Sequence, residues 1–189
     1  MLVLHAWWGL NDDVRAYARR LAEAAFAVET PDLYGGGRVA TDIPGAEALM
    51  KARDKDRAIA EIDRAADQLA ARGPYAVLGW SMGGSYAWDL VERRPGTVTA
   101  LVDHYGGGQV SERLPPILGH YGELDDDPSP AMIRGLEKDL RSAGHVAELH
   151  IYAGAKHWFA EPSRPQYDAG AAAIAWERTV SFLRRTLTG

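Results

Sequence analysis

Ser81 is the first residue of this chain whose surroundings suggest chemistry. It lies in Gly79-Trp80-Ser81-Met82-Gly83, a G-x-S-x-G segment between an apolar run, 75–78, and a helix-compatible run, 84–90. A serine on a sharp turn between a strand and a helix exposes its hydroxyl at the end of a parallel sheet. Glycines flank such a serine because a Cβ in so tight a bend would collide with the neighbouring strand or helix. The segment therefore predicts a nucleophilic serine, with a plain strand–helix turn as the alternative.

A serine hydroxyl is a poor nucleophile at neutral pH, so it needs a base, and the base needs an orienting acid. In this arrangement the acid and then the histidine follow the serine along the chain, each after a later strand. His157 fits the third place, because it follows the strand-like run 146–152 and the turn signal Gly154-Ala155. We therefore predict that His157 is the base.

The acid is expected after the strand-like run 116–122, where three aspartates stand in a row. Asp125 comes first and should lie nearest the carboxyl edge of the sheet, so we predict it as the acid. Asp126 and Asp127 remain alternatives, and a solvated acidic turn would explain the run without any catalytic role. Asp103, at the end of the preceding strand-like run, fits a core or turn role better.

The remaining polar motifs favour structural roles. Five histidines lie in or beside predicted strands or turns: His5, His104, His120, His145 and His150. No H-E-x-x-H motif or grouped ligand spacing is present, so neither a metal site nor a cofactor is expected. Gly35-Gly36-Gly37 lacks the Lys-Ser/Thr that follows in a phosphate-binding loop, and we expect a flexible loop there.

Composition excludes several classes of protein. The chain has 189 residues, 47% of them hydrophobic and 25% charged, and we expect a single domain over 1–189. A net charge of −5 without a basic cluster argues against a nucleic-acid partner, and no apolar segment has the length of a membrane span. The chain has no cysteine and begins with a strand-like run, 2–5, rather than a signal peptide, so we expect a cytoplasmic protein.

Strand-like and helix-like runs alternate from end to end. The expected strands are 2–5, 26–30, 75–78, 98–105, 116–122 and 146–152. One helix is expected after a cap at Asn11, and four more are expected over 56–71, 84–90, 130–143 and 171–187. A long loop is expected over 33–46. This alternation predicts an α/β fold with a mostly parallel central sheet and helices on both faces.

Large aromatic residues accompany the predicted site. Trp8, Trp80 and Trp158 lie beside its segments, and Tyr34 lies in a loop near them. Trp7 also lies beside the site, and core packing would explain at least half of these tryptophans. The functional prediction is an apolar substrate pocket lined by Trp8, Trp80, Trp158 and Tyr34.

Five blocks of the chain, taken together, resemble the dienelactone hydrolase family of α/β-hydrolases, and the likeness extends over nearly the whole chain. The blocks are His5-Ala6-Trp7-Trp8-Gly9-Leu10-Asn11, Pro31-Asp32-Leu33-Tyr34, Gly79-Trp80-Ser81-Met82-Gly83-Gly84, Gly122-Glu123-Leu124-Asp125 and His157-Trp158-Phe159. The resemblance implies a compact α/β-hydrolase fold without a large cap domain. It also implies hydrolysis of small carboxylic esters or lactones, with the backbone amides of Trp7 and Met82 as the oxyanion hole. We further expect a monomer or a weak homodimer.

The chain departs from the family's pattern at three positions. Ser81 stands where the family has a cysteine nucleophile, and Ala6 stands where a glutamate partners that thiol. These two changes agree, since a serine nucleophile has no thiol for a glutamate to partner. Glu161 stands where an arginine holds a substrate carboxylate. The third departure predicts a negative charge in the substrate site and poor binding of anionic lactones such as dienelactone.

Two other functions remain compatible with these residues. The same three side chains could serve a thioesterase or another acyl hydrolase. A non-catalytic member of the fold that only binds ligands would be expected to lack or misplace one of the three.

Overall fold

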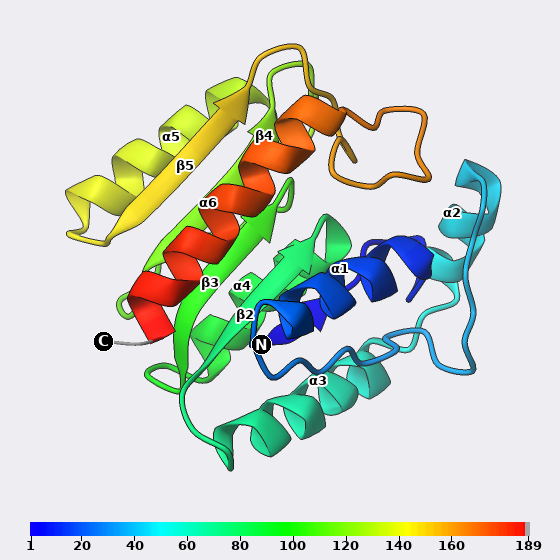
Figure 1. Cartoon of the computed structure of the whole chain (residues 1–189), viewed down its shortest axis with the longest axis horizontal. Coiled ribbons are helices and arrows are strands. Elements are labelled where there is room, and N and C mark those ends of the chain that lie inside the picture. The colour runs from blue at the N-terminus through cyan, green and yellow to red at the C-terminus, as the bar shows by residue number, and fades with distance from the viewer. Residues whose placement is uncertain (188–189) are drawn as a thin grey trace.

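Five parallel strands form the central sheet of the computed structural model, which describes residues 1–187 (Figure 1). The strands are β1 (Leu2–Leu4), β2 (Tyr75–Trp80), β3 (Val98–His104), β4 (Ile117–Gly122) and β5 (Ala147–Tyr152). They lie in the order β1-β2-β3-β4-β5, and every neighbouring pair is parallel. All carboxyl ends therefore meet at one edge, so the loops that follow β2, β4 and β5 can bring their side chains together there.

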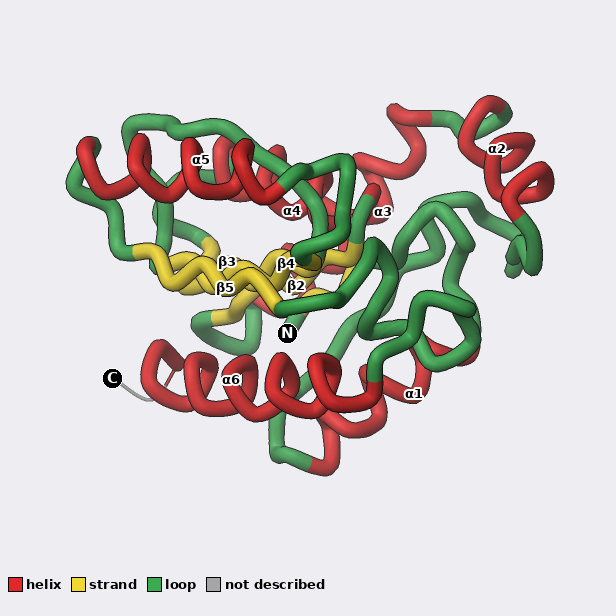
Figure 2. The backbone as a smooth tube through the Cα atoms, turned by 90° about the horizontal axis from the view of Figure 1, so that it is seen from above, coloured by secondary structure: helices red, strands yellow, loops and turns green. Residues whose placement is uncertain are grey.

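Helices cover both faces of this sheet (Figure 2). One face carries α1 (Asp12–Glu23) and α6 (Ala169–Leu187); the other carries α3 (Lys55–Ala70), α4 (Met82–Arg93) and α5 (Pro130–Ser142). A further helix, α2 (Ile43–Lys51), lies beside the sheet rather than on it. The predicted α/β fold class is confirmed, and none of the connections within residues 1–187 forms a separate cap domain.

The side chains of β2 alternate between two hydrophobic cores. Tyr75 and Val77 pack toward α3 and α4, whereas Ala76, Leu78 and Trp80 pack toward α1 and α6. All of these side chains are at most 2% exposed, because helices shield both faces of the strand. A parallel strand buried on both sides therefore appears in the sequence as a continuous apolar run.

Side-chain caps fix the starts of the helices. The Asn11 side chain accepts a hydrogen bond from the Val14 amide and begins α1, as predicted. The Ser129 hydroxyl does the same for the Met132 amide at the start of α5. The predicted ranges of α3, α5 and α6 agree with the structure to within two residues at each end.

Two predicted segments are wrong. Residues 26–30 do not form a strand, because the chain contacts β1 through one isolated bridge, Leu2 to Glu29, before Pro31 follows. The stretch 33–46 is not a loop throughout, because α2 begins inside it at Ile43. The Asp42 side chain accepts a hydrogen bond from the Gly45 amide and Pro44 occupies the first turn, and these two residues together favour the start of a helix.

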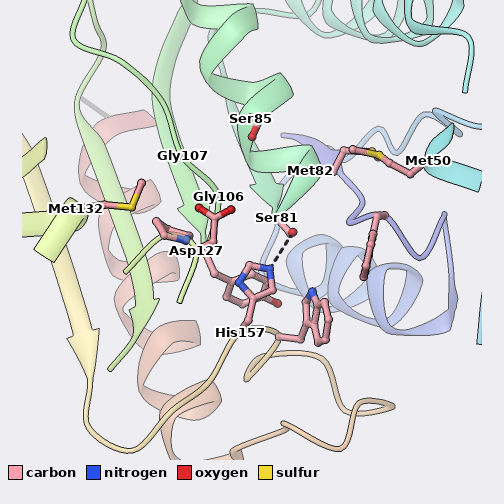
Figure 3. Close-up of a pocket in the computed structure, with 13 residues that line it drawn as sticks. Met50, Ser81, Met82, Ser85, Gly106, Gly107, Asp127, Met132 and His157 are labelled. Atoms are coloured by element: carbon pink, nitrogen blue, oxygen red, sulfur yellow. Dashed lines mark hydrogen bonds between the residues drawn. The ribbon is translucent and has the colours of Figure 1, made fainter. Parts of the chain in front are cut away.

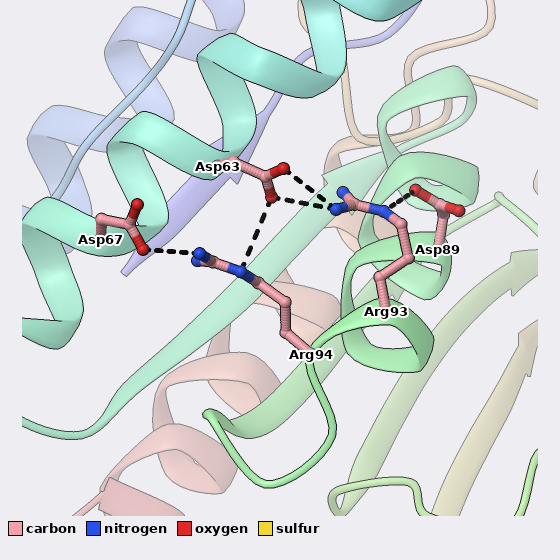
Figure 4. A network of polar contacts seen from close by, with 5 residues as sticks. All are labelled: Asp63, Asp67, Asp89, Arg93 and Arg94. Atoms are coloured by element: carbon pink, nitrogen blue, oxygen red, sulfur yellow. Dashed lines mark hydrogen bonds and ion pairs between the residues drawn. The ribbon is translucent and has the colours of Figure 1, made fainter.

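A network of ion pairs links α3 to α4 (Figure 4). Arg93 donates to Asp63 at 3.0 Å and to Asp89 at 2.7 Å, and Arg94 donates to Asp67 at 2.6 Å. The Arg93 and Asp63 side chains are each 31% exposed, so water screens the pair. Such a network contributes modestly to the free energy of unfolding, and the apolar core must contribute more.

None of the helices described combines the length and the apolar character needed to cross a lipid bilayer.

Candidate active site

Ser81 occupies a strained turn between β2 and α4. Its φ of 51° and ψ of −115° lie outside the regions that residues other than glycine usually adopt. A Cβ on Gly79 would lie 2.2 Å from the Gly83 carbonyl oxygen, and a Cβ on Gly83 would lie 2.3 Å from the Leu4 carbonyl oxygen. The Ser81 amide donates to the His104 carbonyl oxygen at 2.9 Å, which anchors the turn to β3. Both flanking glycines are therefore required by the close approach of β2, α4 and β1.

Three of the predicted side chains form one chain of hydrogen bonds, of which Figure 3 draws the bond between Ser81 and His157. The Ser81 Oγ lies 3.0 Å from His157 Nε2, and His157 Nδ1 lies 2.7 Å from Asp125 Oδ2. Asp125 is buried, whereas Asp126 and Asp127 are exposed. Of the three aspartates, the structure thus places Asp125 against the histidine, and its other oxygen accepts from the Asp127 amide at 3.0 Å.

Backbone hydrogen bonds join the two loops that carry Asp125 and His157. The Glu123 amide donates to the Tyr152 carbonyl at 3.0 Å, and the Leu124 amide donates to the Ala155 carbonyl at 2.8 Å. A Cβ on Gly122 would lie 2.5 Å from the Ala155 carbonyl oxygen, so the loops pack with no room for a side chain there. The carboxylate and the imidazole are consequently held in a fixed relation.

Two aromatic rings flank the imidazole of His157. The Tyr105 ring centroid lies 5.0 Å from it, and the Trp158 centroid also lies 5.0 Å from it. Tyr105 follows β3 and in turn donates its hydroxyl to Glu161 Oε1 at 3.0 Å. The imidazole of His157 is therefore positioned by two aromatic neighbours as well as by the hydrogen bonds at its nitrogens.

Glu161 does not place a negative charge in the substrate cavity, contrary to our prediction. Its side chain is fully buried and does not line that cavity. Burial raises the pKa of its carboxyl to about 8, and the nearby Asp13 adds to the effect. At pH 7 the Glu161 carboxyl is therefore neutral, and it accepts a hydrogen bond from Tyr105. Glu161 in place of the family's arginine thus removes a positive charge without adding a negative one.

The amides of Trp7 and Met82, which we predicted as the oxyanion hole, have no acceptor among residues 1–187. Met82 is the first residue of α4, where backbone N–H groups lack intrahelical partners. Neither amide donates to another protein group in the described part of the chain, and both residues line the cavity that contains Ser81. The Tyr34 hydroxyl donates to the Trp7 carbonyl at 2.9 Å and so fixes the first loop.

The cavity above Ser81 has a volume of about 380 Å³ and is mostly apolar. The Trp7 and Trp158 rings stack with their centroids 5.7 Å apart. In Figure 3, Met50 and Met82 lie on one side of Ser81 and Met132 lies on the other. The described residues that line it are Trp7, Met50, Ser81, Met82, Ser85, Tyr105, Gly106, Gly107, Asp127, Pro128, Met132, His157 and Trp158. Asp127 is the one acidic side chain in this set, and the set contains no lysine or arginine.

Of the four residues predicted to line a pocket, Trp158 does so and Trp8, Trp80 and Tyr34 do not. Trp80 is 1% exposed and faces α1, because side chains alternate along β2. Trp8 is 2% exposed and packs edge-on against Trp158, with the Arg164 guanidinium over its ring at 4.2 Å. Tyr34 is 2% exposed behind the first loop. These three residues support the cavity wall from behind.

The cavity also contains residues that our sequence analysis did not identify. Tyr105 directly follows β3 and precedes Gly106-Gly107, and its position at the carboxyl edge of a parallel sheet is a signal that could have found it. Met50 lies on α2, a helix that was not predicted, and Met132 lies on α5. No local motif marks these two methionines.

Asp103 has a structural role in this region, as predicted. It is fully buried and accepts hydrogen bonds at 3.0 Å from Trp88 Nε1, the Tyr121 hydroxyl and the Gly106 amide. Burial raises the pKa of its carboxyl to about 6. Asp103 thereby ties α4, β4 and the loop after β3 together beneath Ser81. Among residues 1–187, no group of three His, Cys, Asp or Glu side chains is arranged to hold a metal ion.

The fold and this arrangement of serine, histidine and aspartate define an α/β hydrolase. The sequence pattern of the dienelactone hydrolase family matches residues 1–187, and the chain belongs to that family. It is therefore an enzyme of the class that hydrolyses esters or lactones.

Known proteins resemble the chain over nearly all of its length. A carboxymethylenebutenolidase of Rhodococcus opacus is 32% identical, and the match covers 96% of this chain and 79% of the relative. A probable 2-oxo-3-(5-oxofuran-2-ylidene)propanoate lactonase of Bradyrhizobium is 27% identical over 100% of this chain and 84% of the relative. The crystal structure of a putative dienelactone hydrolase from Klebsiella pneumoniae superimposes with a TM-score of 0.78 at 25% identity, covering 95% of this chain and 84% of that one.

The raised pKa of Glu161 predicts a particular dependence of stability on pH. The folded protein keeps this proton up to about pH 8, whereas the unfolded chain loses it near the ordinary value of 4.5. The free energy of unfolding should therefore fall by up to about 1.4 kcal/mol per pH unit between these values. Glu161→Gln keeps the acceptor for Tyr105 but cannot ionise, so it should gain stability relative to the wild type between about pH 6 and pH 8.

Urea denaturation at a series of pH values measures this difference. Glu92→Gln, at an exposed site on α4, is the matched control and should follow the wild-type profile. Parallel profiles for Glu161→Gln and the wild type would show that Glu161 is already ionised in the folded protein.

Proposed function

We propose that the protein is a serine hydrolase that cleaves small carboxylic esters or lactones through an acyl-enzyme. The observation that carries this proposal is the unbroken hydrogen-bond chain from Ser81 Oγ through His157 to Asp125, at the floor of an apolar cavity. The names of the relatives, a carboxymethylenebutenolidase and a lactonase, support the ester or lactone bond as the target.

In the first half of the proposed reaction, Ser81 Oγ attacks the substrate carbonyl carbon while His157 Nε2 takes the hydroxyl proton. Asp125 accepts the hydrogen bond from Nδ1–H, which fixes the tautomer that leaves Nε2 free to act as a base. The amides of Met82 and Trp7 bind the oxygen that becomes negatively charged. Each such donor lowers the barrier by about 3–4 kcal/mol in comparable enzymes.

In the second half, His157 returns the proton to the leaving alkoxide, and the alcohol departs from the acyl-enzyme. Water then attacks the ester that Ser81 has formed, again with His157 Nε2 as the base. Collapse of the second tetrahedral intermediate releases the acid and restores the Ser81 hydroxyl. The protein's own groups supply every proton transfer, so the proposal needs no cofactor.

The lining of the cavity favours uncharged substrates. Aromatic and methionine side chains would contact the apolar part of an ester or lactone, and Asp127 would repel a carboxylate bound nearby. Because one chain supplies all of these groups, we propose that a monomer is sufficient for activity.

Replacement of the proposed nucleophile tests the mechanism directly. Ser81→Ala should lower kcat for p-nitrophenyl acetate by about 10⁴-fold or more and leave the melting temperature close to that of the wild type. A fluorophosphonate probe should add its mass to a peptide that contains Ser81, both in the wild type and in the control Ser142→Ala, at an exposed site on α5. Turnover that survives in folded Ser81→Ala, or a probe adduct elsewhere in the chain, would refute the proposed nucleophile.

Replacement of the acid tests the role of the Asp125 oxygens. In Asp125→Asn the side-chain amide would donate to His157 Nδ1, so the proton of the ring would move to Nε2, where it blocks proton transfer from Ser81. We expect kcat to fall by about 10⁴-fold, as in serine proteases with this change. Asp126→Asn, at the exposed neighbouring position, should retain the wild-type rate in the same steady-state assay. Equal losses in the two variants would contradict the assignment of Asp125.

A further inference from the structure

A second cavity lies behind the Ser81 turn, on the side of the sheet that faces α1 and α6. We define this α1–α6 cavity by Ala16 and Tyr17 of α1, Trp80 of β2, His104 of β3 and Ala172 of α6, which line it together with neighbouring residues. Its volume is about 110 Å³. It shares no lining residue with the cavity above Ser81.

The walls of the α1–α6 cavity present buried polar atoms that have no protein partner. His104 is fully buried, and both of its ring nitrogens lack a hydrogen bond; the same is true of Trp80 Nε1, on a side chain that is 1% exposed. A buried donor or acceptor without a partner is costly and is rarely left so in folded proteins. One imidazole nitrogen donates and the other accepts, and the indole donates, so the missing partner must both donate and accept.

The surroundings of these atoms carry no net charge. Burial lowers the pKa of His104 to about 3, so its ring is neutral at physiological pH. Asp13 and Arg20, two further lining residues, have opposite charges and other contacts. The Asp13 carboxylate accepts from the Ser163 amide at 3.2 Å, and the Arg20 guanidinium lies 3.9 Å from the centre of the Trp176 ring. The charges of these two side chains cancel, so the pair favours neither a bound cation nor a bound anion.

We propose that the α1–α6 cavity is a second binding site, for a small uncharged polar molecule that donates and accepts hydrogen bonds, such as a short primary amide or diol. Since a water molecule occupies about 30 Å³, the volume suits a ligand of roughly four to six non-hydrogen atoms. The site lies directly behind the reactive turn, because Trp80 precedes Ser81 and the His104 carbonyl accepts the Ser81 amide. It does not depend on the function proposed for Ser81.

Titration with acetamide, observed in ¹H–¹⁵N spectra, tests this site. The indole N–H resonance of Trp80, identified by its loss in Trp80→Phe, should shift and saturate in the millimolar range, as expected for a ligand of so few atoms. Ala16→Leu fills the cavity from α1 without removing a hydrogen-bonding group, so it should abolish the shift. Ala18→Leu, the same change on the same helix outside the cavity lining, should preserve it.

Three results would overturn the proposal. The Trp80 resonance could fail to shift, or it could shift without saturation. The same saturable shift in Ala16→Leu would place acetamide elsewhere, for example in the cavity above Ser81. A crystal soaked in acetamide could show only ordered water beside His104. If Ala16→Leu does not fold, Ala172→Leu fills the same cavity from α6 and should give the same loss.

Discussion

The bend at Ser81 is the constraint on which the rest of the structure depends. β2 is buried on both faces and must pass into α4 within one residue, which forces Ser81 to a φ of 51°. The bend closes only because Gly79 and Gly83 bring no Cβ into the backbone of α4 and β1. The strained backbone conformation of Ser81 is maintained by the hydrogen bond from its amide to the His104 carbonyl and by the hydrophobic cores on either side of the sheet. As a result the serine hydroxyl lies at the carboxyl edge of the sheet, where the loops after β4 and β5 also arrive.

Buried acids around this edge support the site without reaching the substrate cavity. Asp103 joins α4, β4 and the loop after β3 through three hydrogen bonds, and Glu161 holds the Tyr105 hydroxyl while the Tyr105 ring packs on His157. Both have raised pKa values because they are removed from water. Asp125 differs in that its carboxylate contacts the imidazole directly. Three carboxyl groups within one small region therefore have distinct tasks, set by burial and by their partners.

The sequence predicted the features that depend on the order of strands and loops along the chain. It did not predict those that depend on packing between residues distant in the sequence. Parallel strands bring successive loops to one edge, so the positions of Ser81, Asp125 and His157 could be inferred from the strands they follow. Trp80 lies next to Ser81 in the sequence, but side chains alternate along β2, so its ring faces α1 instead of the substrate cavity. Glu161 and Tyr34 are buried, and each forms a hydrogen bond with a residue distant in the sequence, Tyr105 and Trp7 respectively. Met50 reaches the cavity because it lies on α2, whose start is marked in the sequence by Asp42 and Pro44.

The most direct test of the proposed chemistry is to trap the acyl-enzyme. The protein would be mixed with p-nitrophenyl acetate, quenched in acid within the first turnovers and analysed by mass spectrometry after digestion. The account predicts one acetyl group on the peptide that contains Ser81, which disappears as the substrate is exhausted. Steady turnover with no acetylated Ser81 at any time, or an acetyl group transferred through another side chain, would contradict it.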